Sequence, residues 1–300
     1  MGIRDNDQVF ENIGRPINQS QDGPFRLSEY MFHSNNDWSL YATVVQRTEV
    51  LRSGKKLPVM VLLHGGGPDH HSLMPLARQL TELCTVILPD IRGYGRSICA
   101  DPTLHTWAQY TNDVITLLDK IGASTAIVGG AGLGATLSLR VALAFPNRVD
   151  ALVLISVEDV ENEESKKAEI AFMEAFANRV RTQGIEAAWD PILKDLSPII
   201  GSLVRDAIPR SNAESIAAAA SIGYDRSFKN VKELAEISVP TLIIPGIDWR
   251  HPKAFAEHLA NIIPNGKLAP VTLSLELQTA EDFGEVFSPV IRDFLIRNIG

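Results

Sequence analysis

The sequence predicts an α/β fold, and three observations carry this prediction. Short apolar segments alternate with helix-length segments along most of the 300-residue chain. The apolar segments lack the every-second-residue pattern of half-exposed strands, as expected when helices cover both faces of a parallel sheet. Apolar residues make up 45% of the chain, which is enough for a sizeable core.

The predicted elements follow one another in a regular order. Residues 1–25 are polar and predict an irregular N-terminal arm. Two early strands are expected at 27–32 and 38–46, because the polar run between them is typical of a turn. The apolar segments then predict strands at 58–63, 85–89, 125–129, 150–156 and 240–245. Helices are expected between them at 71–83, 103–121 and 133–145.

The stretch from 157 to 235 interrupts this alternation because it shows helical patterns and no strand. Its helices are expected at 161–181, 185–196, 202–207 and 212–220. We interpret 157–235 as a helical cap inserted into an α/β core made of 26–156 and 236–300. The alternative is a helical excursion that does not touch the substrate. A last strand at 266–273 and a closing helix at 281–299 complete the core.

Charge and cysteine content narrow the possible partners. A net charge of −8 disfavours nucleic acids and anionic membrane surfaces. Apolar runs are too short to span a membrane, and the start of the chain lacks the apolar core of a signal peptide. We therefore expect a cytoplasmic protein that acts on a small molecule. Cys84 and Cys99 show neither metal nor disulfide spacing, and a structural role for Cys99 is favoured over a nucleophilic one.

A glycine-rich turn in the middle of the chain has the frame of a catalytic motif. Gly130, Gly132 and Gly134 form a G-x-G-x-G pattern between an apolar strand and a helix-like run that starts at Leu133. A strand, a tight turn and a helix form the setting of the G-x-S-x-G nucleophile elbow. Gly132 occupies the position of the serine and has no side chain that could attack a substrate.

Three further segments share a pattern with one known family. His64 to Gly67 follow an apolar strand, Asp90 to Ser97 read D-x-R-G-x-G-x-S, and Asp248 follows a late apolar strand. With the glycine turn, these segments make the chain resemble the α/β-hydrolase superfamily from residue 28 to residue 298. The resemblance implies an α/β-hydrolase fold with a mostly parallel sheet and a helical cap. It also implies an oxyanion hole made by the backbone N–H groups of Gly66 and Leu133.

The acid and the base of a catalytic triad are harder to assign. The resemblance favours Asp248 as the acid, with Glu158 or Asp159 as the alternative position. The histidine that the family carries after its last strand is missing, since no histidine follows His258. His251 is the best displaced base because it lies three residues after Asp248.

Other residues are expected to line the substrate pocket. Gly65, His70 and His71 belong to the glycine loop or follow it directly, and Trp249 lies between Asp248 and His251. Several cap aromatics suggest an apolar ligand, although aromatic residues at helical spacing are more often core; they are Phe172, Phe176, Trp189 and Tyr224. No histidine and carboxylate set shows metal spacing and no nucleotide-binding glycine pattern occurs, so we expect no metal and no cofactor.

Three functional hypotheses fit these residues. The first is a hydrolase of small esters, lactones or amides whose nucleophile is replaced by Gly132. The second is an enzyme with nucleophile-free chemistry on the same fold, such as a lyase, an isomerase or a hydrolase in which water attacks directly. The third is a small-molecule-binding protein without catalysis. We favour the first.

Overall fold

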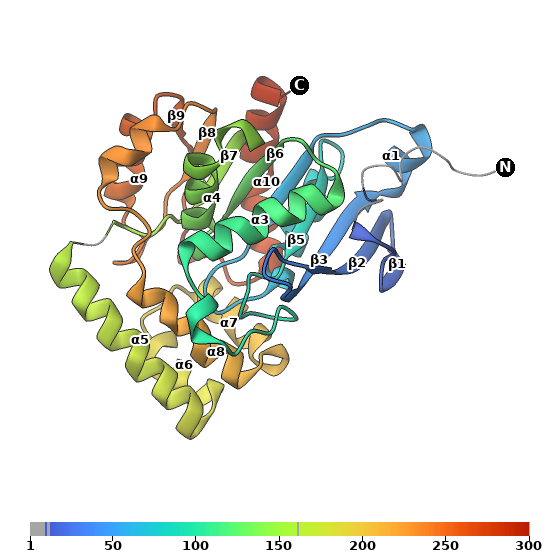
Figure 1. Ribbon diagram of the computed structural model, residues 1–300. Helices are drawn as coiled ribbons and strands as arrows, with labels where there is room; N and C mark the ends of the chain where they lie inside the picture. The colour runs from blue at the N-terminus through green and yellow to red at the C-terminus, as the bar shows by residue number, and fades with distance from the viewer. Residues whose placement is uncertain (1–9, 11–12, 161, 300) are drawn as a thin grey trace.

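The computed structural model describes residues 10, 13–160 and 162–299. In this part of the chain, nine strands form a single sheet in the order β1-β2-β3-β5-β4-β6-β7-β8-β9 (Figure 1). The first three are β1 (Asn18–Asp22), β2 (Phe25–His33) and β3 (Ser39–Arg47), which pair antiparallel. β1 lies inside the segment expected to be irregular. Its side chains are all exposed, so no apolar pattern marks it in the sequence.

The remaining strands make the sheet mostly parallel, as predicted. They are β4 (Val59–Leu63), β5 (Thr85–Pro89), β6 (Ala126–Ala131), β7 (Val149–Ile155), β8 (Thr241–Ile244) and β9 (Gly266–Leu268). β4 and β8 are buried along their whole length, which explains their continuous apolar sequences. β9 is shorter than the predicted strand 266–273. It ends before Pro270, which has no N–H to donate to a neighbouring strand.

Helices cover both faces of the sheet. One face packs against α3 (Trp107–Ile121), α4 (Leu133–Ala144) and α9 (Lys253–Ile262). The other face packs against α2 (Met74–Leu80) and α10 (Ala280–Ile299). Two helices were not predicted from the sequence, α9 and the short α1 (Thr48–Ser53). None of the helices in the described ranges combines the length and the apolar character that crossing a membrane requires.

The segment between β7 and β8 is a helical insertion, as its sequence predicted. Its main helices are α5 (Glu163–Gln183), α6 (Ile185–Leu193), α7 (Pro198–Ala207) and α8 (Ala213–Ala219). They gather at one end of the molecule (Figure 1), where α7 packs against α10. Phe176 and Val180 belong to a separate small core inside the insertion, where the Trp189 ring meets the Phe176 ring at 5.0 Å. Phe172 and Tyr224, in contrast, are exposed.

The insertion meets the α/β core at the loops that follow β4 and β5. The ring of Trp189 lies against Gly67, and a Cβ built on that glycine would come within 2.7 Å of it. Ser215 donates a hydrogen bond of 2.9 Å to the carbonyl of Gly93 and accepts one of 2.8 Å from the N–H of Cys99. The carboxyl edge of the sheet is therefore covered by the insertion.

Candidate functional site

The predicted elbow is present in the backbone. Gly132 joins β6 to α4 with φ 52° and ψ −117°, a backbone conformation that residues other than glycine rarely adopt. The turn also brings the chain very close to β4, since a Cβ on Gly134 would lie 2.1 Å from the carbonyl oxygen of Leu63. The two glycines thus serve different purposes: Gly134 permits close packing, whereas Gly132 stands at the strained corner where the family carries its serine.

His251 faces this corner. A Cβ built on Gly132 would lie 3.5 Å from His251 Nε2 and 3.9 Å from the Cα of Gly65, both ordinary contact distances. On the other side of the ring, His251 Nδ1 donates a 2.8 Å hydrogen bond to Asp248 Oδ1. The same carboxylate accepts the backbone N–H groups of Arg250 and His251 at 2.9 and 3.1 Å. The structure therefore brings His251 and Asp248 together beside position 132.

The electrostatics of Asp248 fit the role of an orienting acid. Burial opposes the ionisation of Asp248. The hydrogen bond and the charge of His251, together with the two backbone N–H donors, favour ionisation and outweigh burial. The pKa of Asp248 consequently lies below its ordinary value. An ionised Asp248 keeps the proton of the imidazole on Nδ1, so that Nε2 can accept a proton from a group at position 132.

Two further polar groups lie at this site: Glu158, which the sequence offered only as an alternative triad acid, and Tyr94, which the sequence did not assign to the site. Glu158 Oε1 lies 3.9 Å from His251 Nε2 and 3.4 Å from Arg250 Nη2. It faces the opposite nitrogen from Asp248, so it does not act as the alternative triad acid. The hydroxyl of Tyr94 lies 3.8 Å from the place of a Cβ on Gly66. Burial and then the charge of Glu158 raise the pKa of Tyr94, which keeps this hydroxyl protonated.

The loop with the predicted oxyanion donors is held by His64. Its Nδ1 donates to the carbonyl of Gly65 at 2.8 Å, and its Nε2 accepts the backbone N–H of Ile91 at 2.9 Å. Complete burial lowers the pKa of His64, so the ring stays neutral and can donate and accept at once. A Cβ on Gly66 would lie 4.0 Å from the Cβ of Leu133, which places the two predicted donor residues next to each other.

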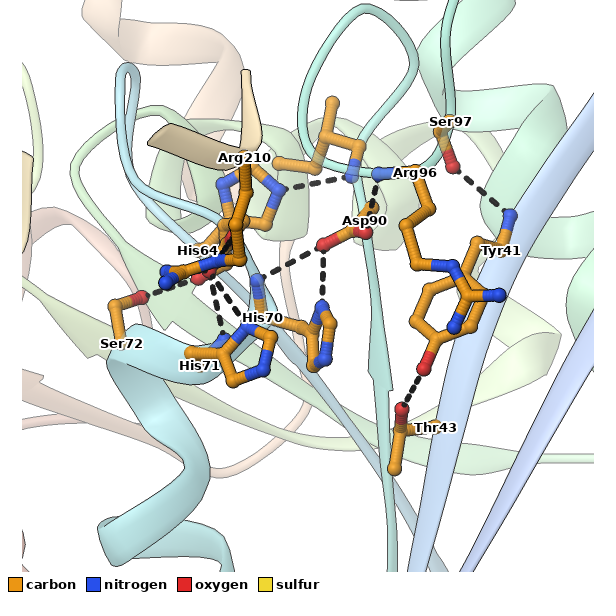
Figure 2. A network of polar contacts seen from close by, with 12 residues as sticks. Tyr41, Thr43, His64, His70, His71, Ser72, Asp90, Arg96, Ser97 and Arg210 are labelled. Atoms are coloured by element: carbon orange, nitrogen blue, oxygen red, sulfur yellow. Dashed lines mark hydrogen bonds and ion pairs between the residues drawn. The ribbon is translucent and has the colours of Figure 1, made fainter. Parts of the chain in front are cut away.

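His70 and His71 belong to a different network (Figure 2). His70 Nδ1 donates to Asp90 at 2.8 Å, and His71 Nδ1 donates to Asp69 at 3.1 Å. Arg210, from the helical insertion, also binds Asp69 with Nε and Nη2 at 2.7 and 3.1 Å. Among the described residues, neither histidine comes within 4 Å of a Cβ at position 132. These side chains connect loops to the insertion instead of facing the elbow.

Two other sequence predictions concern the position of Trp249 and the absence of a metal site. Trp249 was expected in the pocket, but its side chain is 77% exposed and lies at the surface. Asp69, His70 and His71 offer potential metal-ligand atoms within 4.8 Å of one another, although their sequence spacing suggested no metal site. Both oxygens of Asp69 already accept hydrogen bonds from Arg210, so a cation would have to displace a guanidinium group. This cluster fits an ion-pair network better than a metal centre.

Comparisons with known proteins identify the family of this fold. The sequence profile of the α/β hydrolase fold family matches residues 58–269. An epoxide hydrolase of Caballeronia sordidicola is 43% identical over 113 residues, which cover 36% of this chain and 33% of that enzyme. The chain thus spans only about a third of the length of this curated relative.

Solved structures extend the match to nearly the whole chain. The enol-lactonase of Burkholderia xenovorans LB400 superposes with a TM-score of 0.67 and 20% identity, covering 93% of this chain and 100% of the lactonase. A thermophilic esterase of Thermogutta terrifontis superposes with a TM-score of 0.71 and 19% identity, covering 91% and 100%. At such identities the superpositions show the fold alone. Since the family profile itself covers more than half of the chain, the protein belongs to the α/β hydrolase fold family.

Proposed function

We propose that this protein hydrolyses small, mainly apolar esters, lactones or amides by direct attack of water instead of a serine. One observation carries the proposal: His251 Nε2 faces the corner at Gly132 while Asp248 holds the opposite nitrogen. A glycine at this corner leaves room where a serine hydroxyl would stand. A water molecule in this space lies within reach of a base that is oriented as in a catalytic triad.

The reaction follows from these positions. His251 accepts a proton from the water as the water oxygen attacks the acyl carbon. The negative charge that develops on the carbonyl oxygen is stabilised by the N–H groups of Gly66 and Leu133, which do not depend on any side chain at position 132. The protonated His251 then donates its proton to the leaving alcohol or amine, and Asp248 stabilises the transient imidazolium.

The helical insertion acts as a cap in this proposal. Trp189 lies against Gly67 in the glycine loop, and Arg210 binds Asp69 just after this loop. A substrate bound at Gly132 is therefore enclosed between the core and the insertion. Exclusion of bulk water strengthens the hydrogen bonds to the developing charge. The names of the relatives, an epoxide hydrolase, an enol-lactonase and an esterase, support hydrolysis of a small molecule as the class of reaction.

The test is a panel of chromogenic esters and lactones, measured with the natural chain, Gly132→Ser and His251→Ala. We expect slow turnover by the natural chain and loss of this turnover in His251→Ala. We expect faster turnover by Gly132→Ser, because a Cβ fits at this position and a hydroxyl there would meet His251.

The possible outcomes separate the hypotheses. Turnover by Gly132→Ser alone would show a competent hydrolase frame but contradict attack by water in the natural chain. No turnover by either protein would contradict hydrolysis and favour a binding role, which thermal-shift measurements with the same esters would then examine.

A further inference from the structure

We propose that Glu158 is a second catalytic residue, which holds the attacking water jointly with His251. This inference rests on the proposed function, because it concerns the water that replaces the serine. Glu158 lies just beyond β7, on a different loop from His251 and Asp248, and its carboxylate reaches the same corner. None of the expected roles of a triad explains a carboxylate on the Nε2 side of the histidine.

The distance between the two groups suits a shared water. Glu158 Oε1 and His251 Nε2 are 3.9 Å apart, too far for a direct hydrogen bond. A water at about 2.8 Å from each atom would see them at an angle of roughly 90°, near the angle between its own O–H bonds. Both atoms accept hydrogen bonds when His251 is neutral, so the water donates one proton to each. Its oxygen lone pairs then point away from both and toward a substrate.

The carboxylate has hydrogen-bonding capacity to spare. Its contact with Arg250 Nη2 measures 3.4 Å, longer than the 2.7–2.9 Å of a strong charge-assisted hydrogen bond. Arg250 also lies 3.4 Å from Glu169, so the guanidinium is shared between two acids. An ionised carboxylate accepts about four hydrogen bonds. Arg250 therefore orients Glu158 but leaves most of the hydrogen-bond acceptor capacity of its carboxylate free. The Glu158 side chain is only 25% exposed, so few solvent molecules can fill that capacity.

The role of Glu158 in the reaction is that of an acceptor whose own protonation does not change. One O–H bond of the water breaks as its proton moves to His251, and the oxygen forms a bond to the acyl carbon. The second proton of the water stays hydrogen-bonded to Glu158. The bond from the acyl carbon to the alcohol oxygen then breaks, and the alcohol takes the proton from His251. The second proton remains on the carboxylic acid product, which releases it to solvent.

The test compares Glu158→Gln with Glu164→Gln, which removes an exposed carboxylate in the first turn of α5. We expect kcat to fall roughly 10- to 100-fold in Glu158→Gln with KM nearly unchanged, because an amide can no longer hold the water as an anion does. Glu164→Gln should keep the kcat of the unsubstituted chain. An unchanged kcat in Glu158→Gln, in an enzyme that does hydrolyse the panel, would overturn the role of Glu158 alone.

Two further measurements test the inference, and the first of them does not require an active protein. A high-resolution crystal structure should show a water within hydrogen-bonding distance of both Glu158 and His251, and its absence would overturn the inference even for an inactive protein. A single turnover in ¹⁸O-water should place ¹⁸O in the acid product. Unlabelled product from the first turnover would instead show that a carboxylate of the protein attacks the substrate, and would overturn the role of Glu158 as a water holder.

Discussion

Two of the histidine–aspartate pairs near the carboxyl edge of the sheet have hydrogen bonds of the same length. His251 donates to Asp248 at 2.8 Å, and His70 donates to Asp90 at 2.8 Å. Each aspartate also accepts two backbone N–H groups. The bond itself therefore does not distinguish a catalytic pair from a structural one.

The difference lies in what each pair connects. Asp248 and His251 belong to one short loop, so their bond fixes a ring whose other nitrogen faces position 132. Asp90 and His70 come from different loops and tie the segment after β4 to the segment after β5. The ring of His70 packs against the rings of Tyr41 and His71. In the proposed function the local pair orients a base, whereas the pair between His70 and Asp90 holds two loops together.

The largest expected effect is on activity, which should fall when His251 is replaced and should largely remain when His70 is replaced. His251→Ala should reduce kcat/KM about 10³-fold, equivalent to about 4 kcal/mol, because the base is lost. The free energy of unfolding should change little. His70→Ala should retain activity within about tenfold and lower the free energy of unfolding instead. Ester hydrolysis and urea denaturation of both variants measure the two effects, and a similar loss of activity in both would contradict the distinction.

The two aspartates should differ in the same way as their histidine partners. Asp90→Ala leaves three donors without an acceptor, two of them on the buried His70, so we expect the free energy of unfolding to fall by about 3 kcal/mol. Asp248→Ala, at a less buried site, should lower the free energy of unfolding by less than half as much and should mainly reduce kcat. Chemical denaturation provides the comparison. Equal destabilisation would show that both pairs are structural.

Acid should lower the stability of the fold through histidines that are buried in the neutral form, and His105 is the clearest case. Burial lowers the pKa of His105 to about 4, whereas an unfolded histidine titrates near 6.5. Between these values the unfolded chain binds a proton that the folded chain does not, so stability falls as the pH falls from 6.5 to 4. We expect a contribution of about 2–3 kcal/mol over this interval.

This dependence can be isolated by substitution. The free energy of unfolding, measured between pH 7 and pH 4.5, should depend less on pH in His105→Gln than in the natural chain. Acidic residues contribute to both proteins alike and cancel in the difference. An unchanged dependence would contradict a neutral His105 in the folded protein.

The smallest expected effect concerns the ion pair between the insertion and the core. Arg210→Ala removes both hydrogen bonds to Asp69, but the Arg210 side chain is 36% exposed, so we expect a loss of only about 1 kcal/mol in stability. Asp206→Ala provides a control, since it removes only the other, more exposed partner of Arg210. Thermal unfolding of the two variants checks the difference, and equal losses would mean that the contact with Asp69 adds nothing.

Much of this molecule could be predicted from the sequence because its signals are local. Continuous apolar runs marked β4 to β8, and the glycine pattern marked the elbow before its backbone angles were known. His251 and Asp248 were predicted as partners because they are three residues apart. The position of Glu158 on the Nε2 side of His251 and the contact of Arg210 with Asp69 could not be predicted, since both join segments that only the fold brings together. β1 was missed because it lies at the edge and buries no side chain.

The corner at Gly132 has a further, genetic consequence. If Gly132 is encoded by GGU or GGC, a single base change gives a serine codon and places a hydroxyl opposite His251. A serine in this backbone conformation would cost about 1–3 kcal/mol in strain, which glycine avoids. In the proposed function, the residue that withholds a covalent nucleophile therefore also makes the fold easier to maintain.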